Sequence, residues 1–235
     1  MAGPVALVGA GEFTPAMVEI DRGLLEATGR HRPRVAVLPT ASAPDGEETF
    51  RRWAAQGVEH FSALGAEVEA VLVRDRAEAD DPEHAQAVGE ADLVYFSGGK
   101  PEHLLEVLEG SLVWAAALDA HARGAVLAGC SAGAMVLAAR QPRLRRRVLP
   151  FPLGWQAGLG IVPGAAVLPH YDRFPEAFAA LVVLQAPRGT TILGIDEETA
   201  LVGRDRSWQV QGRARVTVWR GRRRVRLRAG DVLRL

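Results

Sequence analysis

Ser131 lies in the segment GCSAG, residues 129–133, which matches the pattern G-x-S-x-G. Apolar residues at 124–128 and 132–139 predict a buried strand before it and a helix after it. This context favours a nucleophile elbow over a tight turn without chemistry, because small neighbours permit a strained turn that exposes the serine. We therefore predict that Ser131 is a nucleophile and that the next N–H group, on Ala132, faces the developing oxyanion.

Cys130, the only cysteine, directly precedes this serine. A thiolate is the more reactive nucleophile, so glutaminase or amidotransferase chemistry through Cys130 is an alternative. However, a side chain before the centre of the motif should turn into the core, where free cysteine commonly lies. We expect Cys130 to be a core residue. A single cysteine also excludes an intramolecular disulfide, and no Cys/His cluster indicates structural zinc.

A serine nucleophile needs an adjacent base, which is a histidine in most such sites. His170 follows the apolar segment AAVL, at the carboxyl end of a predicted strand, where α/β sheets place their sites. The remaining histidines lie in or beside polar helical segments and are expected on the solvated surface: His31, His60, His84, His103 and His121. We predict that His170 is the base.

The base in turn needs a carboxylate that orients the imidazole and stabilises its protonated form. The candidates near predicted strand ends are Asp172, Asp196, Glu197 and Glu198. Spacing in the sequence does not choose among them.

The elements that position these residues alternate between strands and helices. Predicted strands cover 5–8, 34–38, 67–73, 91–96 and 124–128; predicted helices cover 15–27, 82–90, 104–108 and 113–122, and another follows a capping box of Asp45 and Glu48. This order predicts a flavodoxin-like, mostly parallel sheet with helices on both faces.

The pattern changes after residue 139. A connection rich in Pro and Arg covers 141–155, the apolar segment 158–168 leads to His170, and a helix is predicted near 175–184. From Thr191 onward, short alternating segments separated by glycines predict a C-terminal antiparallel strand extension. We assign residues 1–235 to a single domain.

Charge and composition restrict the partners. Basic and acidic residues number 28 each, so no overall field attracts nucleic acid or a membrane, and we expect neither. The basic runs at 143–147 and 220–228 could bind phosphate, but in the second Val225 and Leu227 alternate with arginines, as in a half-buried strand. The N-terminus lacks a basic leader, and no stretch of about 18 apolar residues follows. We expect a cytoplasmic protein.

Four segments, in this order, resemble the dipeptidase E and cyanophycinase family of serine peptidases: YFSGGKPEHLLEVL (95–108), AGCSAGAMVLA (128–138), GLGIVPGAAVLPHYDRF (158–174) and GIDEETALVG (194–203). The family shares its fold with class I glutamine amidotransferases. The resemblance implies one peptidase domain of this fold, a small peptide substrate, and chemistry that needs neither metal nor organic cofactor.

The resemblance also implies roles for individual residues. Ser131 is the nucleophile, His170 the base and Glu197 the acid of a Ser-His-Glu triad, with Asp196 as the second candidate for the acid. Gly99 supplies an oxyanion-hole N–H beside that of Ala132. The sequence pattern is consistent with this role for Gly99, because the Gly-Gly turn at 98–99 follows the predicted strand 91–96 and is expected at the same sheet edge as Ser131.

Two departures from the family pattern concern the substrate. The Gly-Gly turn usually continues with Asn or Asp and then Gln or Thr, but this chain has Lys100 and Pro101. Cyanophycinases carry a DQHF-like sequence with several arginines downstream, whereas this chain has LPHYDRF with Arg173. We expect a short acidic or isoaspartyl-type peptide, with cleavage of cyanophycin or Asp-X dipeptides left open. Candidate substrate contacts are Lys100, which could pair with a substrate carboxylate, Asp172 and Arg173.

A catalytically silent family member that binds a small molecule or peptide is a further alternative. The predicted edge strand 232–235 could pair with another copy by sheet extension, so a monomer and a homodimer are both open.

Overall fold

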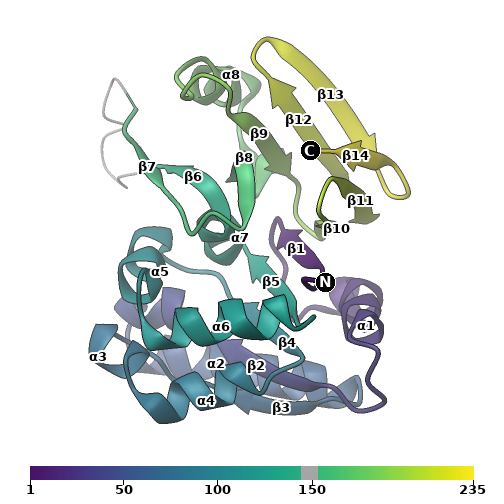
Figure 1. Cartoon of the computed structure of the whole chain (residues 1–235). Helices are drawn as coiled ribbons and strands as arrows, with labels where there is room; N and C mark the ends of the chain where they lie inside the picture. The colour runs from purple at the N-terminus through teal and green to yellow at the C-terminus, as the bar shows by residue number, and fades with distance from the viewer. Residues whose placement is uncertain (144–152) are drawn as a thin grey trace.

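The computed structural model describes residues 1–143 and 153–235 and forms a mixed α/β fold (Figure 1). Its first sheet has the strand order β14-β11-β10-β1-β5-β4-β2-β3. Five neighbours in this order run parallel: β1 (Val5–Val8), β5 (Val126–Cys130), β4 (Leu93–Phe96), β2 (Arg34–Leu38) and β3 (Glu67–Ala70). The antiparallel strands at the other end are β10 (Thr199–Arg204), β11 (Ser207–Gly212) and β14 (Val232–Arg234).

A second sheet has the order β13-β12-β9-β8-β6-β7. Its parallel strands are β6 (Ala138–Pro142), β8 (Val162–Leu168) and β9 (Thr191–Ile195); β7 (Trp155–Ala157), β12 (Arg215–Arg220) and β13 (Arg223–Arg228) are antiparallel to their neighbours. The predicted α/β fold with a C-terminal antiparallel extension is confirmed, and the extension is divided between the two sheets. Strands β6 and β7 replace parts of the predicted helix 132–139 and connection 141–155.

Helices cover both faces of the parallel strands. They are α1 (Val18–Ala27), α2 (Glu47–Ala63), α3 (Arg76–Ala79), α4 (Pro82–Gly89), α5 (Pro101–Leu108), α6 (Leu112–Ala122), α7 (Ala132–Leu137) and α8 (Glu176–Leu184). In Figure 1 the parallel strands of the first sheet and α1 to α6 lie in the lower part, and the second sheet with α8 lies in the upper part. No helix within 1–143 or 153–235 combines the length and apolar character needed to cross a bilayer.

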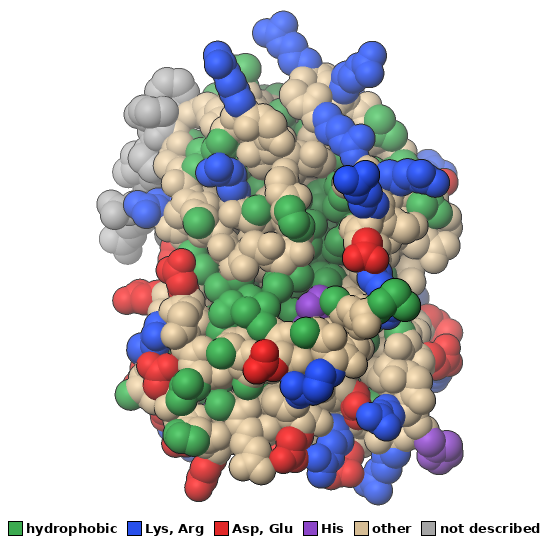
Figure 2. Space-filling model, in the orientation of Figure 1, with side chains coloured by type: hydrophobic (Ala, Val, Ile, Leu, Met, Phe, Trp, Pro, Cys, Tyr) green, Lys and Arg blue, Asp and Glu red, His purple; other side chains and the backbone are tan. Residues whose placement is uncertain are grey.

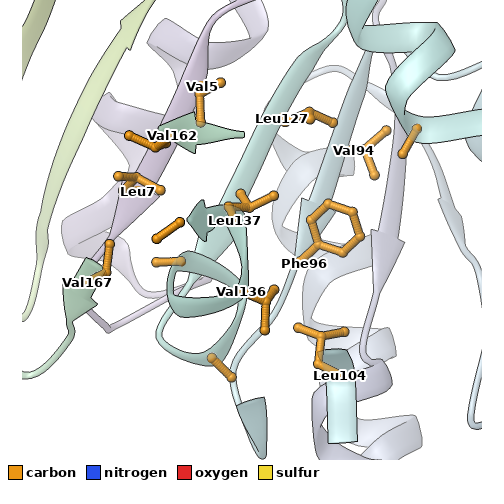
Figure 3. Packing of buried hydrophobic residues seen from close by; sticks show 14 of the residues in the cluster. Val5, Leu7, Val94, Phe96, Leu104, Leu127, Val136, Leu137, Val162 and Val167 are labelled. Atoms are coloured by element: carbon orange, nitrogen blue, oxygen red, sulfur yellow. The ribbon is translucent and has the colours of Figure 1, made fainter. Parts of the chain in front are cut away.

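Successive side chains of a strand point to opposite faces of the sheet, so the buried residues of the first sheet form one core on each face. In β1, Ala6 and Val8 pack on the side of α1 and α2, whereas Val5 and Leu7 pack on the side of α5, α6 and α7. Figure 3 shows Leu137 of α7 between Leu7 and the β4 side chain Phe96. Helix α7 is therefore held between the two sheets, and the residue before it, Ser131, lies where they meet.

Two predictions about polar side chains are wrong. Gly46, not Asp45, is the N-cap of α2, and the Asp45 carboxylate pairs with Lys100 instead. His60 is not solvated: its side chain is 8% exposed, and its Nε2 atom lies 2.8 Å from Oδ2 of the fully buried Asp21. Helix α2 presents His60 to α1, and an amphipathic pattern alone does not reveal a buried polar pair on an inner face.

The basic run 220–228 forms the β12–β13 turn and strand β13, at the edge of the second sheet. The strand was predicted, but its half-buried character holds only for Leu227, which packs against the core, whereas Val225 is 56% exposed. Figure 2 shows many Lys and Arg side chains over the upper part of the molecule, the part in which the second sheet lies. In the other basic run, residues 144–147 lie outside the described residues.

Candidate active site

Ser131 occupies a strained turn between β5 and α7. Its backbone has φ 49° and ψ −105°, a combination that L-residues rarely adopt. Its N–H donates to the Val8 carbonyl at 3.0 Å, and its own carbonyl accepts from Met135 at 3.0 Å. The turn is therefore anchored to β1 on one side and to the first turn of α7 on the other.

The flanking glycines allow the strand and the helix to approach closely. A Cβ atom at Gly129 would lie 2.4 Å from the Gly133 carbonyl carbon, and one at Gly133 would lie 2.2 Å from the Phe96 carbonyl oxygen. Any side chain at either position would push α7 away from β4 and β5. The two glycines of GCSAG are thus required by packing as well as by the turn itself.

His170 comes to Ser131 from the second sheet. It follows β8 in a left-handed conformation, with φ 50° and ψ 38°, and its Nε2 atom lies 3.0 Å from the Ser131 hydroxyl oxygen. The next residue, Tyr171, packs flat on β9, where a Cβ at Gly194 would lie 2.3 Å from its ring. Gly194 therefore brings the histidine loop close to the loop that follows β9.

Glu197 lies on the far side of the imidazole. Its Oε1 atom is 3.0 Å from His170 Nδ1, and its Oε2 atom accepts a hydrogen bond from Arg173 at 2.9 Å. The bond with Arg173, and then that with His170, hold the pKa of Glu197 below its ordinary value. A charged Glu197 can thus orient the imidazole and favour its protonated form.

The other acidic candidates take different positions. Asp196 accepts from the Arg215 N–H at 3.1 Å, and burial, with the nearby charge of Asp172, raises its pKa. Glu198 pairs with Arg213 at 3.4 Å. Neither has a hydrogen bond to His170 among the described contacts. The geometry favours Glu197 as the partner of the imidazole.

Asp172 and Arg173, predicted to contact substrate, both contact Glu197. Asp172 Oδ1 accepts the Glu197 backbone N–H at 3.0 Å, and Arg173 bonds the Glu197 carboxylate. They therefore hold the acid from two directions. Lys100, the third predicted substrate contact, forms an ion pair with Asp45, so its charge is already matched by a neighbouring carboxylate.

The backbone N–H groups of Ala132 and Gly99 are the candidates for an oxyanion hole. Ala132 is the first residue of α7, so its N–H has no partner within the helix. Gly99 follows β4 with φ 146°, and a Cβ there would lie 2.2 Å from the Ala41 carbonyl oxygen. Within the described residues, no backbone carbonyl accepts from either N–H. Both groups are thus available to a ligand beside Ser131.

Glu12 was not among the predicted site residues, although it contacts the residues that directly precede Gly99 and Ser131. It is 7% exposed; Oε1 accepts the Gly98 N–H at 2.8 Å, and Oε2 accepts from the Cys130 thiol at 2.9 Å. A signal was available, because Glu12 follows the turn Gly9-Ala10-Gly11 at the carboxyl end of β1, the sheet edge that also carries Gly99 and Ser131.

Cys130 is fully buried, so its thiol faces the core and not the site. Burial, reinforced by the Glu12 carboxylate, raises the pKa of the thiol well above its ordinary value. The thiol therefore stays protonated in the neutral range. This environment argues against Cys130 as a nucleophile.

We predict that iodoacetamide does not modify Cys130 in the native protein between pH 7 and pH 9. An ordinary exposed thiol reacts about tenfold faster for each pH unit below its pKa of about 8.5, because the thiolate is the reacting form. Intact-mass measurement should show no added group until the protein is denatured with guanidinium. Native alkylation that rises with pH and abolishes activity would instead indicate an accessible thiolate.

Comparison with known proteins identifies the family. The sequence profile described as peptidase family S51 matches residues 5–211. The chain belongs to this family. It is a serine-type peptidase, as the resemblance of its four segments to the dipeptidase E and cyanophycinase family indicated. The match does not distinguish a dipeptidase E from a cyanophycinase.

Solved structures agree with this assignment. A peptidase from an acI-B1 Actinobacterium is 34% identical with a TM-score of 0.89, and the match covers 100% of this chain and 98% of that one. A putative peptidase E protein from Listeria monocytogenes EGD-e has the same fold at 19% identity and a TM-score of 0.60, over 98% of this chain and 100% of that one. The search of curated proteins found no match.

Proposed function

We propose that this S51 peptidase hydrolyses short peptides through a Ser131-His170-Glu197 triad with an oxyanion hole at Gly99 and Ala132. One observation carries the proposal: a serine on a strained elbow lies 3.0 Å from His170 Nε2, and His170 Nδ1 lies 3.0 Å from Glu197. These are the contacts that convert a weakly nucleophilic hydroxyl into a strong nucleophile.

The chemistry then proceeds in two stages. His170 Nε2 takes the hydroxyl proton as Ser131 Oγ attacks the scissile carbonyl carbon, and the oxyanion accepts hydrogen bonds from the Gly99 and Ala132 N–H groups. The tetrahedral intermediate collapses, the protonated His170 gives its proton to the leaving amine, and an acyl-enzyme remains. Water, deprotonated by His170, attacks the ester carbonyl carbon, and the protonated His170 then returns the proton to Ser131 Oγ as the second product leaves. Glu197 keeps the imidazole oriented throughout.

Within this proposal the substrate is a short peptide with an acidic or isoaspartyl residue. The family resemblance and a lysine directly after the Gly99 turn support this class. Asp172 and Arg173 act on Glu197 and not on substrate, as their hydrogen bonds to it suggest. The protein works on a small peptide without nucleic acid or membrane as a partner, in the cytoplasm, as a monomer or a homodimer.

Hydrolysis of a matched set of dipeptides tests the proposal. Asp-Leu, β-Asp-Leu, β-Asp-Arg and Ala-Leu are incubated with wild-type protein and with Ser131→Ala, and free leucine or arginine is measured. We expect cleavage of one or more of the acidic peptides, none of Ala-Leu, and no activity in the variant. Cleavage of β-Asp-Arg alone would indicate a cyanophycin-related substrate. If the folded wild type cleaves none of them and no other short peptide, the silent binding protein is the better account.

Lys100 provides a separate prediction about specificity. If its ammonium group leaves Asp45 to pair with a substrate carboxylate, Lys100→Ala raises KM for the acidic peptide about tenfold with little change in kcat, because a charged contact is lost equally from ground and transition states. Asp45→Asn frees the ammonium group and should lower KM. Unchanged KM values in both variants would assign the lysine to the ion pair alone.

A further inference from the structure

Glu12 joins two parts of the site that are far apart in the sequence. Its carboxylate lies between the end of β4 and the end of β5, accepting from the Gly98 N–H at 2.8 Å and from the Cys130 thiol at 2.9 Å. The donors belong to the residues that directly precede Gly99 and Ser131. A carboxylate buried in this way has lost its hydration and is retained only where its oxygens find donors.

The bond to Gly98 bears directly on the Gly99 N–H. The Gly98–Gly99 peptide contains that N–H, and the peptides on both sides of it are anchored: Glu12 holds the Gly98 amide, and the Ala41 carbonyl accepts the Lys100 amide at 2.6 Å. A Cβ at Gly98 would lie 2.7 Å from Glu12 Oε1 and 3.3 Å from Ser131 Cβ. With both neighbouring peptides held, the Gly98–Gly99 peptide has little freedom to rotate.

The bond to Cys130 anchors the other side. Cys130 ends β5, and the peptide that joins it to Ser131 leads into the strained elbow. The thiol is fully buried and has a raised pKa, so it remains a donor to the carboxylate. One side chain thus sets the distance between the Gly99 turn and the nucleophile.

We propose that Glu12 is a positioning residue for the oxyanion hole. It holds the Gly99 N–H at the position from which this group can donate to an oxyanion beside Ser131. This inference rests on the proposed function, because it concerns the hole that stabilises the tetrahedral intermediate. The property that matters is the reach of an acceptor oxygen to the Gly98 N–H, and the charge of the carboxylate is secondary. Glu12 touches neither substrate nor the reacting atoms.

Reach and charge are separated by two substitutions. Glu12→Gln keeps the length of the side chain and an acceptor oxygen for Gly98 but removes the charge. Glu12→Asp keeps the charge but is one methylene shorter, so its oxygens cannot lie in the same place. We expect Glu12→Gln to retain kcat within about threefold and Glu12→Asp to lose about ten- to a hundredfold in kcat, less than the ~10²–10³ that follows removal of an oxyanion-hole donor.

Several readouts separate positioning from a loss of folding. KM should stay within about twofold in both variants, since ground-state binding does not use the hole. Amide hydrogen exchange should accelerate in residues 97–100 of Glu12→Asp and not in the remainder of the first sheet. Cys130→Ala removes the second donor to Glu12 but leaves the bond to Gly98, so its loss in kcat should be smaller than that of Glu12→Asp.

The outcomes are distinct. The proposal is overturned if Glu12→Asp has wild-type kcat, if Glu12→Gln is the more impaired of the two, or if the variants lose activity only in proportion to unfolded protein seen by circular dichroism. If wild type does not react with a fluorophosphonate, the proposed function fails and not this inference alone. If wild type reacts and Glu12→Asp reacts at the same rate, the inference fails while the triad stands.

Discussion

His170→Ala lowers kcat for peptide hydrolysis by about 10⁶-fold and Glu197→Gln by about 10⁴-fold, with little change in KM. Loss of the imidazole leaves Ser131 without a base, whereas loss of the Glu197 charge leaves a base whose orientation and protonated form are no longer supported. Both substitutions raise the free energy of the transition state and leave that of the bound substrate unchanged, because neither group binds the substrate in the ground state.

Asp196→Asn is the matched control for the acid. Asp196 is the neighbouring carboxylate, but it bonds the Arg215 N–H and not the imidazole, so we expect kcat within about threefold of wild type. Initial rates over a range of substrate concentrations give kcat and KM for each variant. A larger loss in Asp196→Asn than in Glu197→Gln would reverse the assignment of the acid.

Gly99→Ala should lower kcat by about 10²–10³-fold through the oxyanion hole. The added Cβ would lie 2.2 Å from the Ala41 carbonyl oxygen, and φ is 146°, a conformation that alanine rarely adopts. The turn must therefore move, and its N–H with it. Since the substrate carbonyl is hardly charged in the ground state, KM should change little.

A second glycine provides the control for this variant. Gly23 lies inside α1, its φ is helical, and a Cβ there meets nothing within 4 Å. Gly23→Ala should leave kcat unchanged and stabilise the protein by about 0.5–1 kcal/mol. Thermal unfolding of both variants, measured beside kcat, separates a loss of the hole from a loss of folded protein. Wild-type kcat in a folded Gly99→Ala would remove Gly99 from the hole.

Much of the fold and the centre of the site could be predicted because they depend on patterns within short segments of the sequence. The apolar runs that became β1, β2, β4 and β5 are short and bounded by turns, and Ser131 stands between one of them and an apolar helix. His170 was identifiable because it follows a buried strand, β8, at the carboxyl end of that strand. The family resemblance then selected Glu197 among carboxylates that spacing could not separate.

The remainder depends on contacts between distant segments. Residues 138–139 end the predicted helix and 141–142 begin the predicted connection, yet 138–142 form strand β6, which pairs with β8. Glu12 and His60 look like ordinary surface residues until the fold places them against Cys130 and Asp21. Asp45 matched a capping pattern but pairs with Lys100, 55 residues away. No local periodicity reports such pairings.

The most direct test of the triad is the reaction of purified protein with a fluorophosphonate, read as a shift in intact mass, with peptide mapping to locate the label. Only a serine whose proton is removed by a correctly placed base reacts rapidly with this reagent. The triad predicts one label per chain, located on Ser131 and lost in both Ser131→Ala and His170→Ala. A well-folded protein that takes up no label, or one labelled equally in His170→Ala, would contradict it.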